Sequence, residues 1–384
     1  MAVAEDPRLQ DARRREVARV AEMLGVQGLS RVSGELVGPC PACGGVDRFG
    51  INVRKNVFNC RRCEAKGDAI SLVRLVLGCD LAGALTWLEG GAAVEIDPEE
   101  RARRDEAHAR ELARREAEAE RRRGEAIASA RALWRGGREA KGSPVADYLA
   151  LRAMPASIVD APPAVLRYAP DLAYVIQEGG KPETIHRGPA MLALIQGPNG
   201  GLIGVHRTWL DLSRPKGKAD LGLDAAGRPR PAKKVWGSKR RGAIRLSHHR
   251  GEAFRALVMG EGIETTLPAL AADAIPGAAY WAGIDLGHMG GARIMRGEGM
   301  KYAGVPDLDE HEAFLPPRGV EWLLFIQDGD SDPRLTRAKL LAGLRRARAR
   351  VPTVTRASIV HPGEGRDLND LLMDAGTAGA RGTS

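Results

Sequence analysis

The acidic run in LLFIQDGDSDP, residues 323–333, is the first stretch whose residue types could do chemistry. Residues 323–326 are apolar, as in a buried strand, and Asp328, Asp330 and Asp332 follow at alternate positions. Carboxylates this close repel one another unless a cation lies among them. A calcium-binding EF-hand loop is excluded, because Pro and Lys stand where that loop has its invariant Gly and its bidentate Glu.

Acids also follow two other strand-like runs. Glu261 comes directly after LVMG, and Asp367 comes directly after SIVHPGEGR. Since the carboxyl ends of parallel strands share one edge of a sheet, we expect Glu261, Asp328, Asp330 and Asp367 to converge there. Two Mg²⁺ or Mn²⁺ ions about 3.5–4 Å apart would let them coexist and would suit nucleotidyl transfer. The alternative, solvated turns with helix-capping acids, suits Asp332.

Four cysteines have metal-ligand spacing. Cys40, Cys43, Cys60 and Cys63 form the pattern Cys-x2-Cys-x16-Cys-x2-Cys, which is typical of two zinc knuckles joined by a hairpin. Four thiolates leave no open position on Zn²⁺, so the one expected zinc ion is structural, and Cys79 is expected in the core. Basic residues around these pairs favour nucleic-acid contact over a protein-docking ribbon: Arg48, Arg54, Lys55, Arg61 and Arg62.

Positive charge gathers in residues 206–250, which contain 13 Lys and Arg against three Asp, although the whole chain carries only +9. In KKVWGSKRRGAIRL the bases stand between apolar residues, as in a strand pair that lines a groove. We therefore favour a nucleic-acid track over a solvated basic loop. Its candidate contact residues are Arg207, Lys233, Lys234, Lys239, Arg240 and Arg241.

The rest of the chain must position these residues. Its 384 residues, 43% of them hydrophobic, suffice for two or three domains. After residue 253 strand-like and helix-like runs alternate, which predicts a parallel α/β sheet. No apolar run approaches the roughly 18 residues of a membrane span, and the N-terminus lacks the apolar stretch of a signal peptide. An odd number of cysteines argues against a disulfide framework, so we expect a cytoplasmic protein without a membrane partner.

The expected organisation is multidomain, with α+β and α/β parts. Residues 98–123 are almost entirely Glu, Arg and Ala, which predicts an exposed helical linker with i,i+4 ion pairs. Helices are also expected at 8–24 and 126–134, and strands at 190–196 and 202–210. The predicted parts are a zinc ribbon at 1–95, the charged linker at 96–125, a mixed α+β basic subdomain at 126–252, a parallel α/β domain at 253–374 and a disordered tail at 375–384.

These motifs together resemble a known family. LVMGEGIETTLPAL with LLFIQDGDSDP resembles the Toprim domain, in which a strand-end Glu and an Asp-x-Asp bind catalytic magnesium, and GRDLNDLL resembles the third acidic segment of its primase branch. GPCPACGGVDRFGINVRKNVFNCRRCEAKGDAISLV resembles the zinc-binding domain of bacterial DnaG-type primases. GLIGVHRTWL with KKVWGSKRRGAIRL is similar to the basic subdomain that precedes Toprim in them. The sequences GVHRTWL and GEGIETTLPAL are most similar to those of stand-alone primases of phages and mobile elements.

The resemblance implies a DNA primase, a nucleotidyltransferase that makes short RNA primers on single-stranded DNA from nucleoside triphosphates. It implies that Asp328 and Asp330 bind Mg²⁺, that Asp367 assists, and that Glu261 lies beside the metals as a ligand or an acid/base. It also implies that Arg207 and Lys234 face template and nucleotide, with the zinc ribbon on the template where synthesis starts. Phosphoryl transfer depends mainly on positioning and charge neutralisation, which metals and bases supply.

Three departures from the family pattern bear on this interpretation. Cys43 stands where typical members have His, a change that zinc tolerates. The chain ends soon after DLNDLLMDA, so we expect no helicase-docking domain, and a replicative helicase would be a partner only in trans. The insertion SRPKGKADLGLDAAGRPRP has no counterpart that we can assign.

Two other functions remain open from the sequence. A Toprim-type metal-dependent DNA nuclease would use the same acids, which alone do not say whether bonds are made or broken. A non-catalytic DNA-binding replication accessory would also join a four-cysteine site to Toprim, but such chains are shorter and lack a part like 126–252. Magnesium-dependent incorporation of nucleotide separates a primase from both.

Overall fold

The computed structural model describes residues 7–32, 34–90, 98–178, 181–247, 253–295, 299–327, 332–361, 363 and 368. Apart from Leu368, the segment DLNDLLMDA lies outside the described residues, as does the tail expected at 375–384. The chain divides into two compact units. The smaller contains Met1–Glu118 and Ile294–Ala303, and the larger contains Ala119–Arg293 and Gly304–Ser384.

The smaller unit contains an antiparallel sheet in the order β1-β2-β3-β4-β5. Phe49, Phe58 and Leu72 are almost fully buried in the core that the sheet shares with the helices. The strands are β1 (Ser30–Val32), β2 (Glu35–Cys40), β3 (Gly44–Asn52), β4 (Val57–Cys60) and β5 (Lys66–Gly67). The helices are α1 (Pro7–Arg14), α2 (Val17–Met23), α3 (Ala69–Leu77), α4 (Leu81–Leu88) and α10 (Met300–Ala303).

Local hydrogen bonds explain where the N-terminal helices begin and end. The single helix expected at 8–24 is two helices, because the side chain of Asn56 accepts from the Val17 N–H at 2.8 Å and donates to the Arg15 carbonyl at 2.8 Å. Helix α3 begins at an N-cap, since the Asp68 carboxylate accepts from the Ser71 N–H at 3.0 Å. Cys79 lies in the core, as expected.

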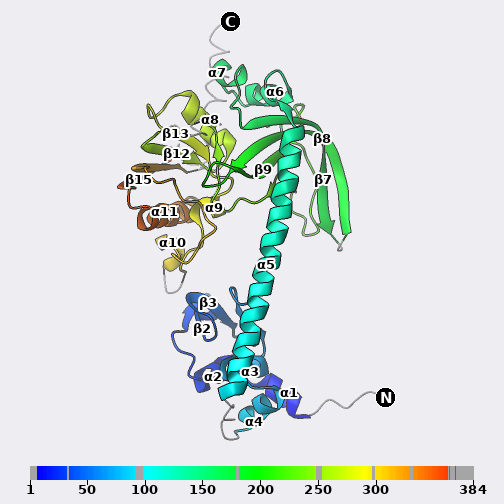
Figure 1. Cartoon of the computed structure of the whole chain (residues 1–384), viewed down its shortest axis with the longest axis vertical. Helices are drawn as coiled ribbons and strands as arrows, with labels where there is room; N and C mark the ends of the chain where they lie inside the picture. Colours follow the sequence, from blue (N-terminus) through cyan, green and yellow to red (C-terminus); the bar gives the residue numbers. More distant parts are fainter. Residues whose placement is uncertain are drawn as a thin grey trace. The chain divides into compact units, whose positions relative to one another are not determined.

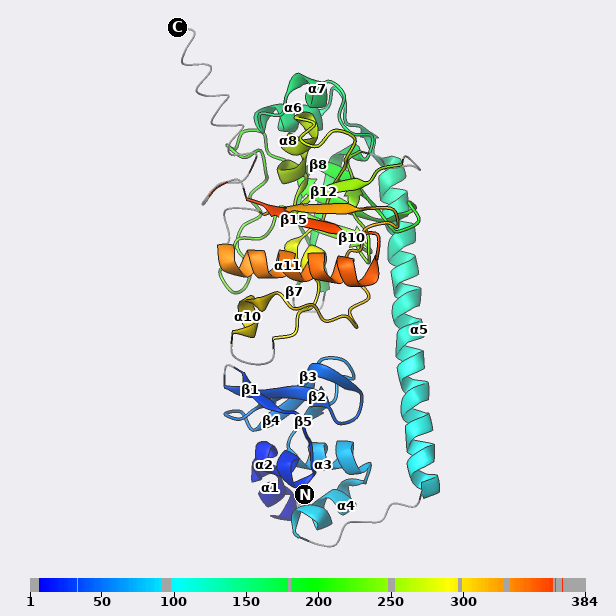
Figure 2. The same cartoon turned by 90° about the vertical axis from the view of Figure 1, so that its left-hand side faces the viewer.

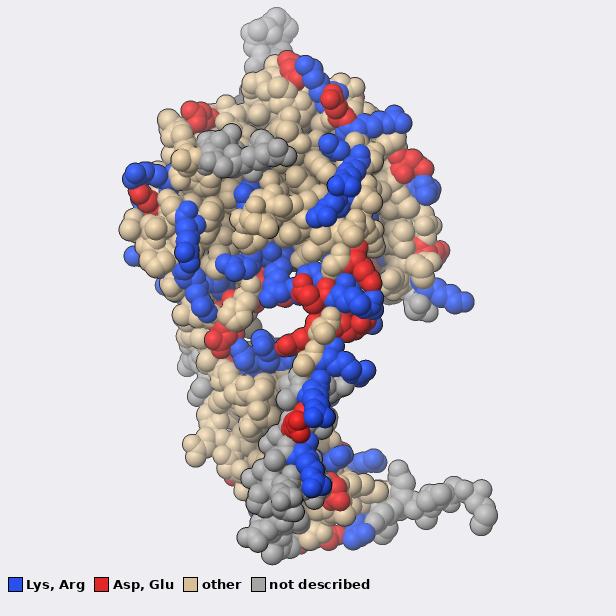
Figure 3. Space-filling model, in the orientation of Figure 1, with Lys and Arg blue, Asp and Glu red and all other residues tan. Residues whose placement is uncertain are grey.

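One continuous helix, α5 (Pro98–Gly136), replaces the expected linker helix and the helix expected after it. Gly124 does not interrupt it, although a glycine inside a helix costs about 1 kcal/mol relative to alanine. Packing of Ala130 against Leu192 and Val205 of the next sheet offsets that cost. Basic and acidic side chains lie side by side along the helix (Figure 3), among them the Arg110–Glu106 pair at 2.7 Å.

The larger unit begins with a second antiparallel sheet, in the order β10-β9-β8-β7-β6. Strands β8 and β9 confirm those expected at 190–196 and 202–210, but β8 begins earlier and forms a long hairpin with β7 (Figure 1). The strands are β6 (Arg138–Glu139), β7 (Leu166–Glu178), β8 (Lys181–Gln196), β9 (Leu202–Trp209) and β10 (Lys233–Gly237). Two short helices, α6 (Pro144–Leu151) and α7 (Ala156–Val159), precede β7.

The alternating pattern after residue 253 forms a mainly parallel sheet, as predicted. Its order is β11-β13-β12-β14-β15, in which only β11 is antiparallel to its neighbour. The strands are β11 (Ile244–Arg245), β12 (Ala256–Gly260), β13 (Ala279–Ala282), β14 (Trp322–Ile326) and β15 (Arg356–Val360). The helices are α8 (Ile263–Ala271), α9 (Leu286–Gly290) and α11 (Pro333–Arg350).

Helices cover both faces of the parallel sheet. Val258 and Leu324 pack on the α8 side, whereas Met259 and Phe325 pack on the α11 side with Leu344. Because side chains alternate along each strand, both faces are apolar and the strands are buried. Figure 2 shows α8 and α11 on opposite sides of β12 and β15.

The two sheets of the larger unit are joined. Strand β11 comes from the segment expected to belong to the basic subdomain, yet it pairs with β13 of the parallel sheet. Just before β11, Ala243 forms a bridge with Gln196 at the end of β8. No single helix among the described residues is long and apolar enough to span a membrane, and α3 with α4 reaches that length only as a pair bent by 109°.

Candidate functional site

The four cysteines come together as the sequence predicts. Cys40 and Cys60 end strands β2 and β4, and Cys43 and Cys63 lie in the turns that follow. All four Sγ atoms lie within 4.8 Å of one another, with Cys40–Cys63 at 3.8 Å and Cys43–Cys60 at 3.6 Å. A tetrahedral zinc with bonds of about 2.3 Å requires sulfur atoms about 3.8 Å apart. The cluster therefore fits one structural Zn²⁺.

Repulsion among four thiolates at these distances also favours a bound cation. Burial and the neighbouring sulfur atoms raise the pKa of the Cys43 thiol. Four thiolates would repel one another at these distances, and a coordinated metal removes that repulsion and deprotonates its ligands.

The predicted basic residues of the zinc ribbon lie on β3, in the turn between β3 and β4, and in the turn between Cys60 and Cys63. Arg54, Lys55, Arg61 and Arg62 are exposed, and Arg48 is half-buried on β3. The Arg61 guanidinium donates to the Asp47 carbonyl at 2.9 Å. Arg54 and Arg61 also line a hollow of about 720 Å³ with Asn52, Asn59, Glu35 and Asp47, so bases, amides and acids share one surface.

In the larger unit, β12 and β14 are adjacent parallel strands, with Met259 opposite Phe325. The chain leaves β12 for β13 on one side, whereas β14 lies on the other side, so the connections diverge between β12 and β14. Ligands of open α/β sheets bind at such a switch point, beyond the carboxyl ends of the strands. Glu261 follows β12 directly and is half-buried at this point.

The other expected metal ligands come after β14 and β15 in the sequence. Gln327 comes directly after β14, is 2% exposed and donates its backbone N–H to the Val360 carbonyl at 2.8 Å. Asp328, Asp330 and Asp367 lie outside the described residues. Asp332 caps α11, because its carboxylate accepts from the N–H groups of the first turn. This confirms the alternative interpretation of Asp332 as a helix-capping acid.

A buried ionic cluster lies beside Glu261. The Glu264 carboxylate, 4% exposed in the first turn of α8, lies 3.0 Å from both the Lys218 and Lys233 ammonium groups. The Tyr148 hydroxyl donates to the same carboxylate at 2.6 Å. Burial alone would raise the pKa of Glu264, but the two lysines and the tyrosine hold it well below its usual value.

Of the predicted basic residues on β10, Lys233 has its ammonium near the carboxyl end of β12 in the parallel sheet. Burial would lower its pKa, but Glu264, with a smaller contribution from Glu261, keeps it above the ordinary value. A methyl group on Gly262 would lie 3.7 Å from the Lys233 ammonium, which shows how near Lys233 lies to the end of β12. Lys233 therefore remains charged, with its ammonium held by Glu264 within electrostatic reach of Glu261.

The neighbouring residue points to the other face of the sheet. Lys233 pairs with Thr208 and Lys234 with Arg207 across β9 and β10, so alternate residues face opposite sides. The Lys234 ammonium lies 4.0 Å from the centre of the Tyr174 ring and donates to the Val175 carbonyl at 2.7 Å. Lys234 and Arg207 thus share a face that does not carry Lys233.

On that face Arg207 lies between two tryptophans. Its guanidinium carbon is 5.1 Å from the centre of the Trp209 ring and 5.2 Å from that of Trp236, and burial lowers its pKa to about 10. The Trp236 indole N–H donates to Ser129 of α5 at 3.0 Å. Arg207 is thus held in place by stacking, the arrangement in which a guanidinium is pre-organised for phosphate.

The remaining predicted bases lie in the loop between β10 and β11. Lys239 forms an ion pair with Asp285, which caps α9. Arg240 lies 3.9 Å from Glu120 and 3.8 Å from Glu312. Arg241 is exposed, has a φ of 53° and donates its backbone N–H to the Glu312 carbonyl.

The sequence did not single out Glu264, Lys218 or Tyr148. Glu264 stands in a helix-like run, where an acid in the first turn has an ordinary structural explanation. Lys218 lies in the insertion that has no assigned counterpart. Its contact with a carboxylate 46 residues away is a tertiary relationship that no local pattern encodes.

Solved structures similar to this chain are primase domains, at low similarity. The zinc-binding and RNA polymerase domains of the Aquifex aeolicus primase are 15% identical with a TM-score of 0.35, covering 98% of this chain and 84% of that one. A DNA primase domain from Pseudomonas aeruginosa is 14% identical with a TM-score of 0.36, covering 66% and 77%. The DnaG primase catalytic domain bound to ssDNA is 12% identical with a TM-score of 0.38, covering 69% and 81%. At these TM-scores the likeness carries no argument about function.

Sequence comparison is less specific. Residues 124–246 match a family described as "Domain of unknown function (DUF7146)". This range covers the last third of α5 and the antiparallel sheet of the larger unit. No curated protein sequence matches the chain significantly.

Proposed function

We propose that this chain is a DNA primase that synthesises short RNA primers on single-stranded DNA from nucleoside triphosphates. The observation that carries the proposal is the adjacency of β12 and β14 at the switch point of the parallel sheet. Glu261 follows the first of these strands, and the Asp328–Asp330 pair follows the second in the sequence. The Toprim-like and primase-like motifs in the sequence supply the rest of the argument.

Glu261, Asp328 and Asp330 would hold Mg²⁺ or Mn²⁺ at this edge, with Asp367 as a further acid. The donor set fits, because these hard cations take carboxylate oxygens together with substrate phosphates. Two bound ions would stabilise both the attacking and the leaving oxygen of an in-line displacement at the α-phosphate. Glu261 would act as a ligand or as an acid/base beside them.

Lys233 would bind the phosphates of the incoming nucleotide. It is charged, near Glu261, and fixed in direction by Glu264. A positive group held at the site of phosphoryl transfer stabilises the charge that develops there without having to reorganise. Glu264 is a positioning residue in this proposal, because it acts through Lys233.

The template would lie along the other bases. Arg207 and Lys234 would bind its phosphates on one face of the antiparallel sheet, and Lys239, Arg240 and Arg241 would do so in the loop after β10. The zinc ribbon would engage single-stranded DNA through Arg48, Arg54, Lys55, Arg61 and Arg62 where synthesis starts. Such a protein would act in the cytoplasm.

A primer-synthesis reaction tests the proposal. The full chain is incubated with single-stranded DNA of mixed sequence, labelled ribonucleotides and Mg²⁺, with controls that lack template or Mg²⁺. Short labelled products that require both are expected. If the template becomes shorter and no labelled product forms, the chain is a nuclease. If the template is bound and remains unchanged without any product, the chain is a non-catalytic accessory.

A further inference from the structure

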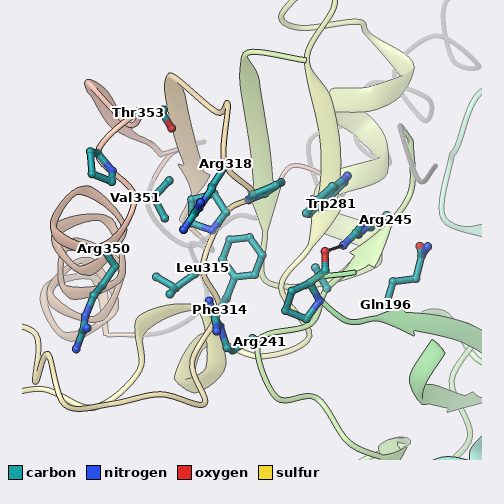
Figure 4. Close-up of a pocket in the computed structure, with 15 residues that line it drawn as sticks. Gln196, Arg241, Arg245, Trp281, Phe314, Leu315, Arg318, Arg350, Val351 and Thr353 are labelled. Carbon is teal, nitrogen blue, oxygen red and sulfur yellow. Dashed lines mark hydrogen bonds between the residues drawn. The ribbon is translucent and has the colours of Figure 1, made fainter. Parts of the chain in front are cut away.

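A hollow in the larger unit is lined by residues that do not include Glu261 (Figure 4). Its walls come from the loop before β14, the loop between α11 and β15, and the segment that leads into β11. Loops that precede parallel strands lie at their amino ends, whereas Glu261 follows a carboxyl end. The first two of these segments therefore lie at the amino ends, whereas the segment that leads into β11 lies near the carboxyl end of β13, because Ile244 pairs with Ala282. The lining of the hollow distinguishes it from the proposed catalytic edge, since it includes neither Glu261 nor Lys233.

Arginines surround this hollow. Arg241, Arg245, Arg318 and Arg350 contribute to its lining from three separate segments. Its described lining residues include no Asp or Glu. Within the described part of the chain, none of these four guanidinium groups has a carboxylate within ion-pair distance. The hollow therefore concentrates positive charge that the protein itself does not neutralise.

Arg245 shows that this charge is partly buried. Its guanidinium lies 4.4 Å from the centre of the Trp281 ring and donates to the Gly197 carbonyl at 2.6 Å. Its Nε atom is buried and has no hydrogen-bond partner among the described residues. Burial lowers the pKa of Arg245, which means that the charged form lacks full solvation. An anion in the hollow would restore that lost solvation.

The size and the walls of the hollow favour a small ligand over a nucleic-acid strand. Its volume is about 640 Å³, within the range of small-molecule sites. Trp281 and Phe314 are each 2% exposed, so their rings form the floor and offer no face for stacking. Sites for single strands present exposed aromatic rings on which successive bases stack. Leu315 and Val351 instead give an apolar wall.

We propose that this hollow binds a free nucleotide. The guanidinium groups of Arg318 and Arg350 contact its phosphate chain, and its base lies against the apolar wall. Guanidinium groups recognise phosphate oxygens through paired N–H donors, and they need no metal ion to do so. The site is distinct from the proposed catalytic edge, and its occupancy does not depend on primer synthesis.

Calorimetric titration of the full chain with ATP, without added Mg²⁺, tests this proposal. Omitting Mg²⁺ removes the metal-dependent part of binding at the proposed catalytic edge, and the variants at the hollow assign the binding that remains. Arg318→Glu and Arg350→Glu are each expected to raise the Kd for ATP about tenfold or more, as for loss of a charged hydrogen bond. Arg348→Glu is the matched control, because Arg348 is also exposed near the end of α11 but does not line the hollow. It should change the Kd less than about twofold.

Two further ligands identify what is recognised. Inorganic tripolyphosphate should compete with ATP but bind more weakly, since it lacks a base. The proposal is overturned if ATP does not bind, or if Arg318→Glu and Arg350→Glu leave its Kd unchanged. It is also overturned if these variants weaken binding only of a single-stranded oligothymidine, because the hollow would then be a strand-binding groove. Unchanged melting temperatures establish that the variants are folded.

Discussion

The Lys233 ammonium lies 3.0 Å from the Glu264 carboxylate, and this pair joins β10 of the antiparallel sheet to the helix that follows β12 of the parallel sheet. Lys218 reaches the same carboxylate from the insertion at 3.0 Å. The cluster therefore fixes three parts of the larger unit relative to one another. It also fixes a cation beside Glu261.

Removing the charge of Glu264 is expected to destabilise the larger unit. Glu264→Gln leaves Lys218 and Lys233 without their shared counter-charge, and breaking a buried ion pair from one side costs about 3–5 kcal/mol. Thermal unfolding followed by circular dichroism measures the effect. Asp171→Asn is the matched control, since it breaks the exposed Arg187–Asp171 pair and should cost less than about 1 kcal/mol. Equal effects of the two substitutions would show that the cluster does not stabilise the unit.

His206 is expected to make the fold sensitive to mild acid. Burial, with the charges of Lys233 and Lys218, lowers its pKa from 6.5 to about 3, so the folded protein keeps this imidazole neutral. Below pH 6.5 the unfolded chain takes up a proton that the folded chain does not. The free energy of unfolding should therefore fall by up to about 1.4 kcal/mol per pH unit from pH 6.5 toward pH 3.

The pH dependence of the melting temperature shows whether His206 causes this loss of stability in acid. His206→Asn should reduce the decrease in melting temperature between pH 6.5 and pH 4.5, whatever its effect on stability at neutral pH. His311→Asn, at an exposed position, should leave the slope unchanged. A slope that is the same in His206→Asn and in the wild type would mean that His206 is protonated in the fold.

Zinc content should distinguish the four clustered cysteines from the fifth. Purified protein is expected to contain one zinc per chain by atomic absorption. Cys43→Ser should lose most of it and unfold the ribbon, because a structural zinc site contributes folding free energy directly. Cys79→Ser should retain zinc, since Cys79 lies in the apolar core. Loss of zinc in both variants, or in neither, would contradict the assignment.

Adjacent lysines on β10 are expected to differ in function, because they face opposite sides of the sheet. Lys233→Met should raise the KM for nucleotide or lower kcat, with little change in the Kd for single-stranded DNA. Lys234→Met should instead weaken DNA binding. It should also reduce the slope of log Kd against log salt concentration by about one, the value for one lost phosphate contact. The opposite assignment of effects would mean that the template lies on the Lys233 side.

The sequence predicts the parallel sheet and the zinc cluster well, because both are encoded locally. Apolar runs that end in acids or glycine define β12 and β14, and the Cys spacing defines the ribbon. Strand β7 was not expected, since Pro170 and Asp171 are unfavourable in strands. The structure accommodates them where the pairing of β7 with β8 shifts register, between Ala169 and Leu172.

Other features depend on contacts that the sequence does not show. Gly124 lies in the interior of α5, where packing of later turns decides that the helix continues. The direction of Lys233 follows from the register of β9 and β10, which a one-residue shift would reverse. The buried cluster joins Tyr148, Lys218 and Lys233 to Glu264, residues brought together only by tertiary folding.

The central claim is that the edge after β12 and β14 carries out nucleotidyl transfer. The most direct test compares Asp328→Asn with the wild type in two assays on the same single-stranded template, namely ribonucleotide incorporation and template binding. We predict that incorporation is abolished while the Kd for template changes by less than about twofold, because the carboxylate would bind metal and not DNA. Wild-type incorporation by the variant, or an equal loss of synthesis and binding, would contradict the account.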